Sequence, residues 1–375
     1  MILNRIKLIG LTLLIILSPS FIISSWDLAQ AQFKEKPAQA KKAPLFHKNQ
    51  IWLQGHLSGK KAFKNKVTLV YFLEYATVNC IRELALIENL KERYGQLGLQ
   101  VVFIHAPEFK FAYERHNVKE AVKRLGIKDP VLLDNDAELW EAYDNRSWPT
   151  KHLVNSSGEI VYSLVGEGNN IEFESQIRDQ IKLLNPKAFL PEREVFSEQD
   201  RFNVWECGEM STEVYVGYKR ANWWGVEISN EKVGDPDVMT LYADDGRRME
   251  RGVFLSGNWV NREEYFEHGS GDGYLGIIYL GTDVYAVMDH PVDGVRSRVY
   301  IYRDDEPLPE KYRGRDIQVD ESGGTFIDVG APRLYYVISG EDQQYHELKL
   351  QVQDARTQIY LFSFSNRCLS EFDHR

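Results

Sequence analysis

The chain has 375 residues, of which 43% are hydrophobic. A chain of this length exceeds what one compact core usually organises, so two domains are expected. The formal net charge of −10 at pH 7 argues against a nucleic-acid partner, which would need a basic face.

The N-terminal segment 1–31 has the layout of a secretory signal peptide. A short basic start precedes a mostly apolar run over 8–23, and small residues stand at Ala29 and Ala31. We predict cleavage after Ala31 and export to the periplasm or the extracytoplasmic face of the membrane. The alternative is an uncleaved membrane anchor, although the run is shorter than the roughly 20 residues of a spanning helix.

The segment 32–44 is polar, contains two prolines and is expected to be a linker. Strand-like and helix-like segments then alternate from residue 45 to 186, which predicts an α/β domain with a mixed central sheet flanked by helices. The expected strands are 67–73, 99–104, 131–133, 151–154 and 160–164, and the expected helices are 80–94, 118–125 and 171–184.

The turn between the apolar strand 67–73 and the next helix carries the pattern Thr77-x-x-Cys80. A thioredoxin-type redox centre lies at such a turn and normally has two cysteines at this spacing. With Thr77 in the first position, no disulfide can form within the turn. A hydroxyl is too weakly acidic to attack a disulfide without an activating base.

Residues from about 46 to 184 resemble the thioredoxin-like module of the TlpA and DipZ group of exported thiol–disulfide proteins. Active members of that group carry a cysteine where this chain has Thr77, often an acidic residue at Tyr71, and a tryptophan at Leu73. The resemblance therefore implies the fold and the compartment, and we expect dithiol exchange to be lost. The matching segments are 75–82, 105–109, 133–136, 140–149 and 166–168.

Trp148-Pro149 directly precedes the predicted hairpin. A proline at this place is usually cis in the thioredoxin fold, and it packs beside the redox turn. Pro149 is therefore expected to shape a groove whether or not chemistry occurs there.

Three interpretations of Cys80 remain open. It is a small buried hydrophobe, as unpaired cysteines often are, or a monothiol that forms mixed disulfides with a partner, or a peroxidatic cysteine. The last follows from the similarity of Thr77-x-x-Cys80 to the peroxiredoxin turn, in which Arg146 would be the accompanying arginine.

No metal or cofactor is predicted. The N-terminal histidines lack metal-ligand spacing, and the acidic stretch 134–136 is typical of a turn. The histidines concerned are His47, His56, His105, His116 and His152.

Pro186 and Pro191 mark a boundary, and 187–209 is expected to be a second linker. The remaining segment, 210–375, has many short strand-like runs separated by turns rich in Gly and Asp, which predicts an all-β sandwich or jelly roll. The expected strands are 214–218, 252–256, 274–280, 284–288, 298–302, 333–338, 347–352 and 358–364.

This segment resembles the C-terminal β-sandwich of DipZ-type proteins, through 212–221, 255–259, 328–335, 346–350 and 360–364. That domain is similar to a carbohydrate-binding module, so the resemblance implies a glycan ligand. Aromatic rings stack on sugars, although the same rings also fill cores. The candidate aromatic residues are Trp223, Trp224, Trp259, Tyr274 and Tyr312.

Cys207 and Cys368 bracket the predicted sandwich. The first and last strands of a sandwich are often neighbours, so a Cys207–Cys368 disulfide is our hypothesis, which leaves Cys80 as the odd thiol.

Two functions follow from these observations. The first is a cell-envelope binding or assembly factor that has lost the dithiol cycle and that engages a protein or a glycan. The alternative is an enzyme, either a Cys80-dependent monothiol oxidoreductase or a peroxiredoxin-like peroxidase.

Overall fold

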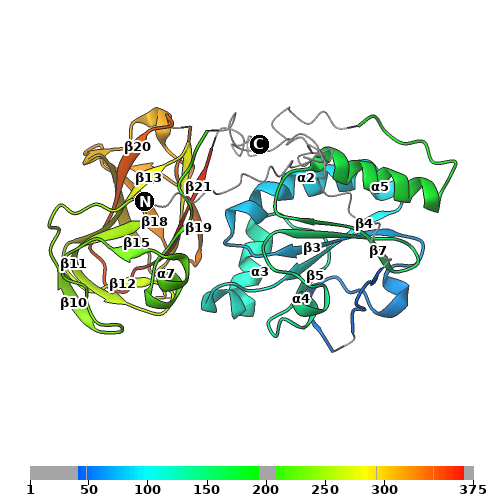
Figure 1. Cartoon of the computed structure of the whole chain (residues 1–375), viewed down its shortest axis with the longest axis horizontal. Helices are drawn as coiled ribbons and strands as arrows, with labels where there is room; N and C mark the ends of the chain where they lie inside the picture. The colour runs from blue at the N-terminus through cyan, green and yellow to red at the C-terminus, as the bar shows by residue number, and fades with distance from the viewer. Residues whose placement is uncertain (1–40, 48, 194–207, 293, 341, 367–375) are drawn as a thin grey trace, which may run out of the picture. The chain divides into compact units, whose positions relative to one another are not determined.

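The computed structural model describes residues 41–47, 49–193, 208–292, 294–340 and 342–366 (Figure 1). The predicted signal segment, most of the first linker and the hypothetical Cys207–Cys368 disulfide lie outside these residues. Within the described ranges, no helix is both long enough and apolar enough to cross a membrane.

A seven-stranded mixed sheet forms the centre of the N-terminal domain, in the order β1-β7-β6-β3-β4-β5-β2. Strand β3 runs parallel to β4 and antiparallel to β6, and all its residues are buried. This is the burial expected of an unbroken apolar run in a strand covered on both faces. The strands are β1 (Lys41–Lys42), β2 (Ile51–Gln54), β3 (Val67–Leu73), β4 (Leu99–His105), β5 (Val131–Leu133), β6 (Thr150–Val154) and β7 (Glu159–Val165).

Helices cover both faces of this sheet because successive side chains of a strand point to opposite sides. Leu69 and Tyr71 of β3 share one buried cluster with residues of α2 and α5, whereas Val70 and Phe72 share another with Leu139 of α4. Figure 1 shows α2 and α5 along one side of the sheet and α4 along the other. The helices are α2 (Val78–Tyr94), α3 (Arg115–Arg124), α4 (Glu138–Ala142) and α5 (Asn170–Leu184), with 3₁₀ turns η1 (Gly59–Ala62), η2 (Gly95–Leu97) and η3 (Lys110–Tyr113).

The C-terminal domain is a β-sandwich. Its described strands pair in the order β17-β18-β15-β20-β13-β11-β12-β21-β14-β19, with four short strands at the sides. Among these described strands, all pairings except that of β9 with β11 are antiparallel. Leu350 of β20 and Phe362 of β21 belong to the same buried cluster, so the two layers enclose one core.

The described strands of this domain are β8 (Val214–Tyr215), β9 (Glu227–Ile228), β10 (Met239–Tyr242), β11 (Gly252–Asn261), β12 (Phe266–His268), β13 (Gly273–Leu280), β14 (Asp283–Asp289), β15 (Ser297–Arg303), β16 (Glu306–Pro307), β17 (Gln318–Val319), β18 (Thr325–Val329), β19 (Arg333–Ile338), β20 (Tyr345–Val352) and β21 (Gln358–Ser365). One short helix, α7 (Tyr218–Trp224), and the 3₁₀ turn η5 (Glu310–Tyr312) accompany them.

Strand β11 belongs to both layers. Its first half pairs with β13, and its second half pairs with β10 and β12. Gly257 lies where the partners change and has a φ of 91°. A Cβ atom there would come within 2.6 Å of the Asp272 carbonyl oxygen, so only glycine fits this corner.

One strand expected from the sequence is shorter than predicted. Strand β8 ends at Tyr215, and α7 begins at Tyr218, where the sequence pattern indicated a strand from 214 to 218. Gly217, with a φ of 87°, turns the chain between the two elements.

Candidate functional site

The turn between β3 and α2 has the backbone geometry of a helix start. Thr77 is the N-cap of α2 with extended dihedrals, and its carbonyl oxygen accepts the N–H groups of Cys80 (3.1 Å) and Ile81 (3.2 Å). The Thr77 hydroxyl does not cap the helix. It donates instead toward the Glu108 carboxylate, at 3.4 Å.

Cys80 lies in the first turn of α2 and is fully buried, with 0% of its surface exposed. Its Sγ accepts the Glu74 N–H at 3.5 Å, and its thiol faces the Phe72 carbonyl oxygen at 4.0 Å. Burial raises the pKa of the Cys80 thiol well above its ordinary value, and the nearby carboxyls of Glu74 and Glu83 act in the same direction. The thiol is therefore protonated and enclosed at neutral pH.

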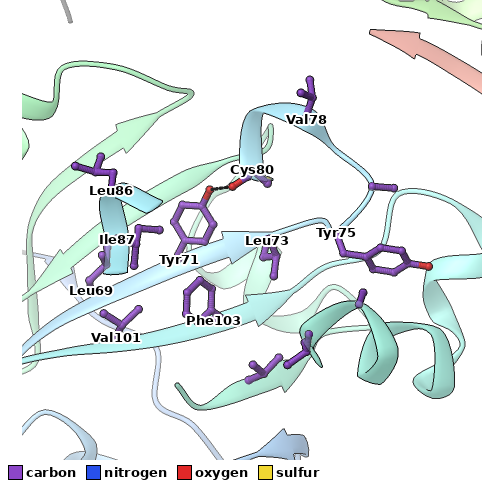
Figure 2. Packing of buried hydrophobic residues seen from close by; sticks show 14 of the residues in the cluster. Leu69, Tyr71, Leu73, Tyr75, Val78, Cys80, Leu86, Ile87, Val101 and Phe103 are labelled. Carbon is purple, nitrogen blue, oxygen red and sulfur yellow. Dashed lines mark hydrogen bonds between the residues drawn. The ribbon is translucent and has the colours of Figure 1, made fainter. Parts of the chain in front are cut away.

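Tyr71 packs its ring under this turn (Figure 2). Its hydroxyl donates a hydrogen bond to the Cys80 carbonyl oxygen at 3.0 Å. Leu73, on the same face of β3, lies in the same buried cluster. These side chains pack beneath the helix start, where Cys80 is fully buried.

A buried ion pair lies behind the turn. Lys151 of β6, which has 0% of its side chain exposed, pairs with Glu83 of α2. Burial raises the pKa of the Glu83 carboxyl despite the opposing charge of Lys151. The Lys151 ammonium also lies 5.4 Å from the centre of the Phe173 ring. The pair fastens α2 to β6.

Glu74 and His105 form a buried polar pair that the sequence analysis did not find. Both are 0% exposed, with 3.7 Å between the Glu74 carboxyl oxygen Oε2 and His105 Nε2. Glu74 accepts the N–H groups of Ala76 (2.9 Å) and Glu108 (2.8 Å). Burial raises the pKa of Glu74 to about 8 and lowers the pKa of His105 to about 3. The sequence does contain one sign of this pair, because Glu74 is a charged residue directly after the apolar strand 67–73.

Residues of the sandwich segment contact this turn through Glu108. The Tyr215 hydroxyl of β8 donates to the Glu108 carboxylate at 2.8 Å, and the Arg220 guanidinium lies 3.6 Å from it. The Glu108 side chain is only 6% exposed, and burial raises its pKa to about 7. The Thr77 hydroxyl donates to the same carboxylate, and Thr77 itself is only 9% exposed.

A second set of contacts ties α2 to its surroundings. The Arg82 guanidinium pairs with Glu167 at 3.0 Å and donates to the Ser365 hydroxyl of β21 at 2.9 Å. These bonds connect the first turns of α2 to Glu167 and to β21.

The Trp148–Pro149 peptide bond is cis. Pro149 is buried, its carbonyl oxygen accepts the Gly166 N–H at 2.8 Å, and the Trp148 ring packs on Trp140 at 4.5 Å. Arg146, the candidate for a peroxidase-type site, has an 82% exposed side chain and pairs with Asp144 at 3.5 Å. In the described ranges, no recorded contact joins Arg146 to Cys80.

The described residues contain no group of three or more His, Cys, Asp or Glu side chains that could hold a metal ion. Asp134 accepts the N–H groups of Leu139 (2.9 Å) and Trp140 (2.7 Å), so it orders the turn before α4.

The aromatic residues proposed to bind glycan occupy different environments. Trp259 is fully buried and Tyr312 is 9% exposed, so neither ring faces a ligand at the surface. Trp223 and Trp224 are exposed on α7, and Trp224 stacks on Tyr215 at 5.0 Å. Tyr274 of β13 lines a cavity, which makes it the best placed of the five.

The cavity at Tyr274 has a volume of about 310 Å³ and lies on the outer face of strands β13, β15 and β20. Tyr302, Asp305, Lys349 and Gln351 complete its lining. Two half-buried tyrosines surrounded by polar side chains offer both a stacking surface and hydrogen-bonding groups.

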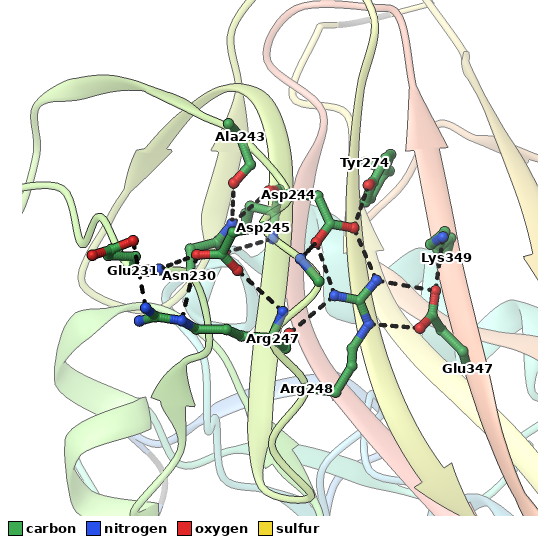
Figure 3. Close-up of polar contacts among 12 residues, drawn as sticks. Asn230, Glu231, Ala243, Asp244, Asp245, Arg247, Arg248, Tyr274, Glu347 and Lys349 are labelled. Carbon is green, nitrogen blue, oxygen red and sulfur yellow. Dashed lines mark hydrogen bonds and ion pairs between the residues drawn. The ribbon is translucent and has the colours of Figure 1, made fainter.

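An ion-pair network fixes one wall of this cavity (Figure 3). The Tyr274 hydroxyl donates to Asp244 at 2.6 Å, and Arg248 binds Asp244 with two nitrogens at 2.8 and 2.9 Å. Arg248 also pairs with Glu347 at 2.6 Å and stacks 3.6 Å above the Phe254 ring. Hydrogen bonds from Arg248 lower the pKa of Asp244, so the carboxylate stays charged.

Comparison with known families agrees with this architecture. Residues 38–181 match the family model described as Redoxin, and residues 211–365 match the model described as Thioredoxin like C-terminal domain. The chain therefore combines a mixed α/β thioredoxin-like domain with a C-terminal antiparallel β-domain.

Among individual proteins, the chain is similar to the protein DipZ of Mycobacterium tuberculosis, at 26% identity over 248 residues, which is 66% of this chain and 34% of DipZ. It is 27% identical over 185 residues to the thiol-disulfide oxidoreductase ResA of Bacillus cereus, covering 49% of this chain and 98% of ResA. NHL repeat-containing protein 2 of Bos taurus is 33% identical over 129 residues, covering 34% of this chain and 18% of that protein. The chain spans about a third of the length of its DipZ relatives.

Proposed function

We propose that this protein is an exported thioredoxin-like protein that has lost dithiol exchange and acts as a binding or assembly factor of the cell envelope. One observation carries the proposal. The single thiol of the turn, Cys80, is fully buried, and the position three residues before it is Thr77.

Dithiol exchange needs an exposed thiolate to attack and a second thiol to resolve the mixed disulfide. In this proposal Thr77 replaces the first cysteine, and its hydroxyl is engaged with Glu108. The raised pKa of Cys80 keeps the remaining thiol protonated. Both requirements are therefore unmet, while the fold around the turn is intact.

Export is part of the proposal. It is supported by the signal-peptide pattern of 1–31 and by the resemblance to exported thiol–disulfide proteins. Fractionation of cells that express the full chain tests it, since a protein retained in the cytoplasm with an intact N-terminus contradicts export.

Activity assays test the loss of exchange. Purified protein is incubated with a disulfide substrate and dithiothreitol, and separately with hydrogen peroxide. We expect both reactions to proceed at the rate without protein. Turnover by the wild type that disappears in Cys80→Ala contradicts the proposal and supports a monothiol oxidoreductase or a peroxidase.

The cavity at Tyr274 supports a second proposal, that the sandwich binds a glycan. Tyrosine faces stack on sugar rings, and Lys349, Gln351 and Asp305 supply donors and acceptors for hydroxyl groups. The Asp244–Arg248 network holds Tyr274 in place, so the wall is formed before a ligand arrives.

Titration with a panel of soluble envelope oligosaccharides tests glycan binding. We expect Tyr302→Ala to weaken binding about fivefold or more, since stacking on an aromatic ring is worth about 1 kcal/mol or more. Tyr345→Ala is the matched control, because Tyr345 is 54% exposed and does not line the cavity. Equal affinities for wild type and Tyr302→Ala argue against this site.

A further inference from the structure

A histidine at the start of β20 lies between two carboxylates. The His346 side chain is 11% exposed, with Nδ1 2.7 Å from Asp304 Oδ2 and Nε2 2.9 Å from Asp342 Oδ1. An imidazole donates hydrogen bonds from both nitrogens only in its charged form, which has a proton on each. The two contacts together are therefore those of a charged histidine.

We propose that protonation of His346 is a pH switch that fixes the turn Asp304-Asp305 and, with it, one wall of the Tyr274 cavity. Asp305 lines that cavity, and Asp304 is the residue that His346 holds. The charged histidine keeps the turn closed, and the neutral histidine releases it. The consequence for glycan binding rests on the second proposal above, whereas the switch itself does not.

The turn Asp304-Asp305 has an unfavourable backbone conformation. It joins β15 to β16, and its two residues have φ values of 50° and 66°. Two-residue hairpin turns with positive φ at both positions favour Asn or Asp followed by Gly, and here the second position is Asp305. A conformation of this kind persists where contacts from outside the turn hold it.

Strand β20 supplies those contacts. The Asp304 N–H donates to the Glu347 carbonyl oxygen at 2.9 Å, and the Glu347 N–H donates to Asp304 Oδ1 at 2.9 Å. Lys349 pairs with Asp305 at 2.5 Å. His346 and Lys349 are three residues apart on one strand, so their side chains point to opposite faces of the sheet. The turn is therefore held from both faces, and His346 is the contact on one of them.

Among the described groups around the imidazole, the histidine is the one whose charge changes near neutral pH. Arg303 of β15 lies 3.6 Å from Asp304 Oδ2, and the ring of Tyr279 of β13 lies 6.0 Å from the imidazole. Arginine, tyrosine and aspartate ordinarily titrate outside the range from about pH 5 to 8, whereas histidine titrates within it.

The direction of the switch follows from the donors of the ring. A neutral imidazole has one N–H for two carboxylates, so one carboxylate then faces a lone pair. The closed turn binds the charged form, and it is therefore favoured at low pH and lost as the pH rises through the titration of His346.

Hydrogen exchange of the Asp304 amide tests the switch without any ligand. NMR of the full chain follows this exchange and the carbon signals of the His346 imidazole from about pH 6 to about pH 8.5. We expect protection, corrected for the intrinsic exchange rate, to fall about fivefold or more as the imidazole loses its proton. Constant protection while the imidazole titrates, or an imidazole that does not titrate in this range, overturns the proposal.

Variants assign the response to this histidine. His346→Gln is neutral at every pH and should show low protection that does not change with pH, with circular dichroism as the check of folding. Asp342→Asn removes one carboxylate and should move the loss of protection to lower pH. His116→Gln, at an exposed position of α3, is the matched control and should respond like the wild type. Wild-type pH dependence in His346→Gln contradicts the assignment.

Titration with the oligosaccharide panel at both ends of the pH range separates this proposal from that of glycan binding. We expect binding to be weaker at the higher pH in the wild type and equal at both in His346→Gln. Absence of glycan binding with an intact response of the turn contradicts only the second proposal above. Glycan binding without a response of the turn contradicts only the switch.

Discussion

The Tyr71 hydroxyl donates a hydrogen bond to the backbone carbonyl oxygen of Cys80, with 3.0 Å between the two oxygens. The bond joins the middle of β3 to the first turn of α2, and both residues are 0% exposed. The turn that resembles a redox centre is thus packed as part of the core. Its thiol is enclosed by the same side chains that stabilise the helix start.

The first prediction concerns this bond. Tyr71→Phe should lower the free energy of unfolding by about 1 kcal/mol or slightly more, because a buried carbonyl oxygen loses its side-chain donor while the ring remains. Denaturant unfolding monitored by circular dichroism measures the change. Tyr113→Phe, at a 46% exposed tyrosine, is the control and should be nearly neutral. A Tyr71→Phe variant as stable as the control would contradict the role given to the hydroxyl.

The second prediction restores a second thiol. Thr77 is the N-cap of α2 and Cys80 lies in its first turn, so Thr77→Cys should form a disulfide with Cys80 under mild oxidation. Mass spectrometry of the unreduced 77–80 peptide detects it as a loss of two hydrogens. Thr77→Ser is the matched control and cannot form the bond. Free thiols in Thr77→Cys after oxidation would mean that the turn does not have this geometry.

The third prediction follows from the raised pKa of Glu74. Its carboxyl titrates near 8 when folded and near the ordinary value of 4.5 when unfolded, so the folded state holds one more proton between these values. The free energy of unfolding therefore falls as pH rises across this window, by up to about 1.4 kcal/mol per pH unit.

Glu74→Gln should remove this contribution. Urea unfolding at several pH values from 5 to 8 should show a shallower decline of the free energy of unfolding for the variant than for the wild type. His105 contributes with the opposite sign in both proteins, so its contribution cancels when the variant is subtracted from the wild type. Glu92→Gln, at an exposed position of α2, should keep the wild-type slope. Equal slopes for Glu74→Gln and the wild type would show that Glu74 is charged when folded.

The fourth prediction concerns the contact of Tyr215 with Glu108, the residue whose carboxylate accepts the Thr77 hydroxyl. Tyr215→Phe removes the donor to Glu108 and leaves a buried carboxylate with one partner fewer. We expect amide hydrogen exchange over residues 76–82 to accelerate several-fold, because this contact holds the loop that Thr77 bonds to. Tyr218→Phe, at a hydroxyl that bonds the exposed side chain of Asp237 at 3.3 Å, is the control. Faster exchange confined to residues near 215 would contradict the coupling.

The local elements could be predicted from the sequence because their signals are local. The apolar run 67–73 became β3, and the apolar spacing after Cys80 became α2, which begins at Val78 and ends at Tyr94. Periodicity also placed the alternation of strands and helices in the first domain and the many strands of the second. These patterns depend only on neighbours within one element.

The polar contacts of the site could not be predicted in the same way. Glu74 meets His105 and Glu108, which are about thirty residues away, and Glu108 in turn meets Tyr215, more than a hundred residues away. The burial of Trp259 could not be predicted either. A tryptophan in a Gly-rich strand is compatible both with the surface and with the core, and Trp259 lies in the core.

The reactivity of Cys80 tests the central claim most directly. Native full-length protein is treated with a water-soluble maleimide, and the Cys80 peptide is quantified by mass spectrometry over time, with urea-denatured protein as the reference. The account predicts labelling at least about a hundredfold slower in the native state, because labelling must await opening of a core whose stability is several kcal/mol. Labelling of native Cys80 at the rate of the denatured protein, or its conversion to a sulfenic acid by stoichiometric peroxide, would contradict it.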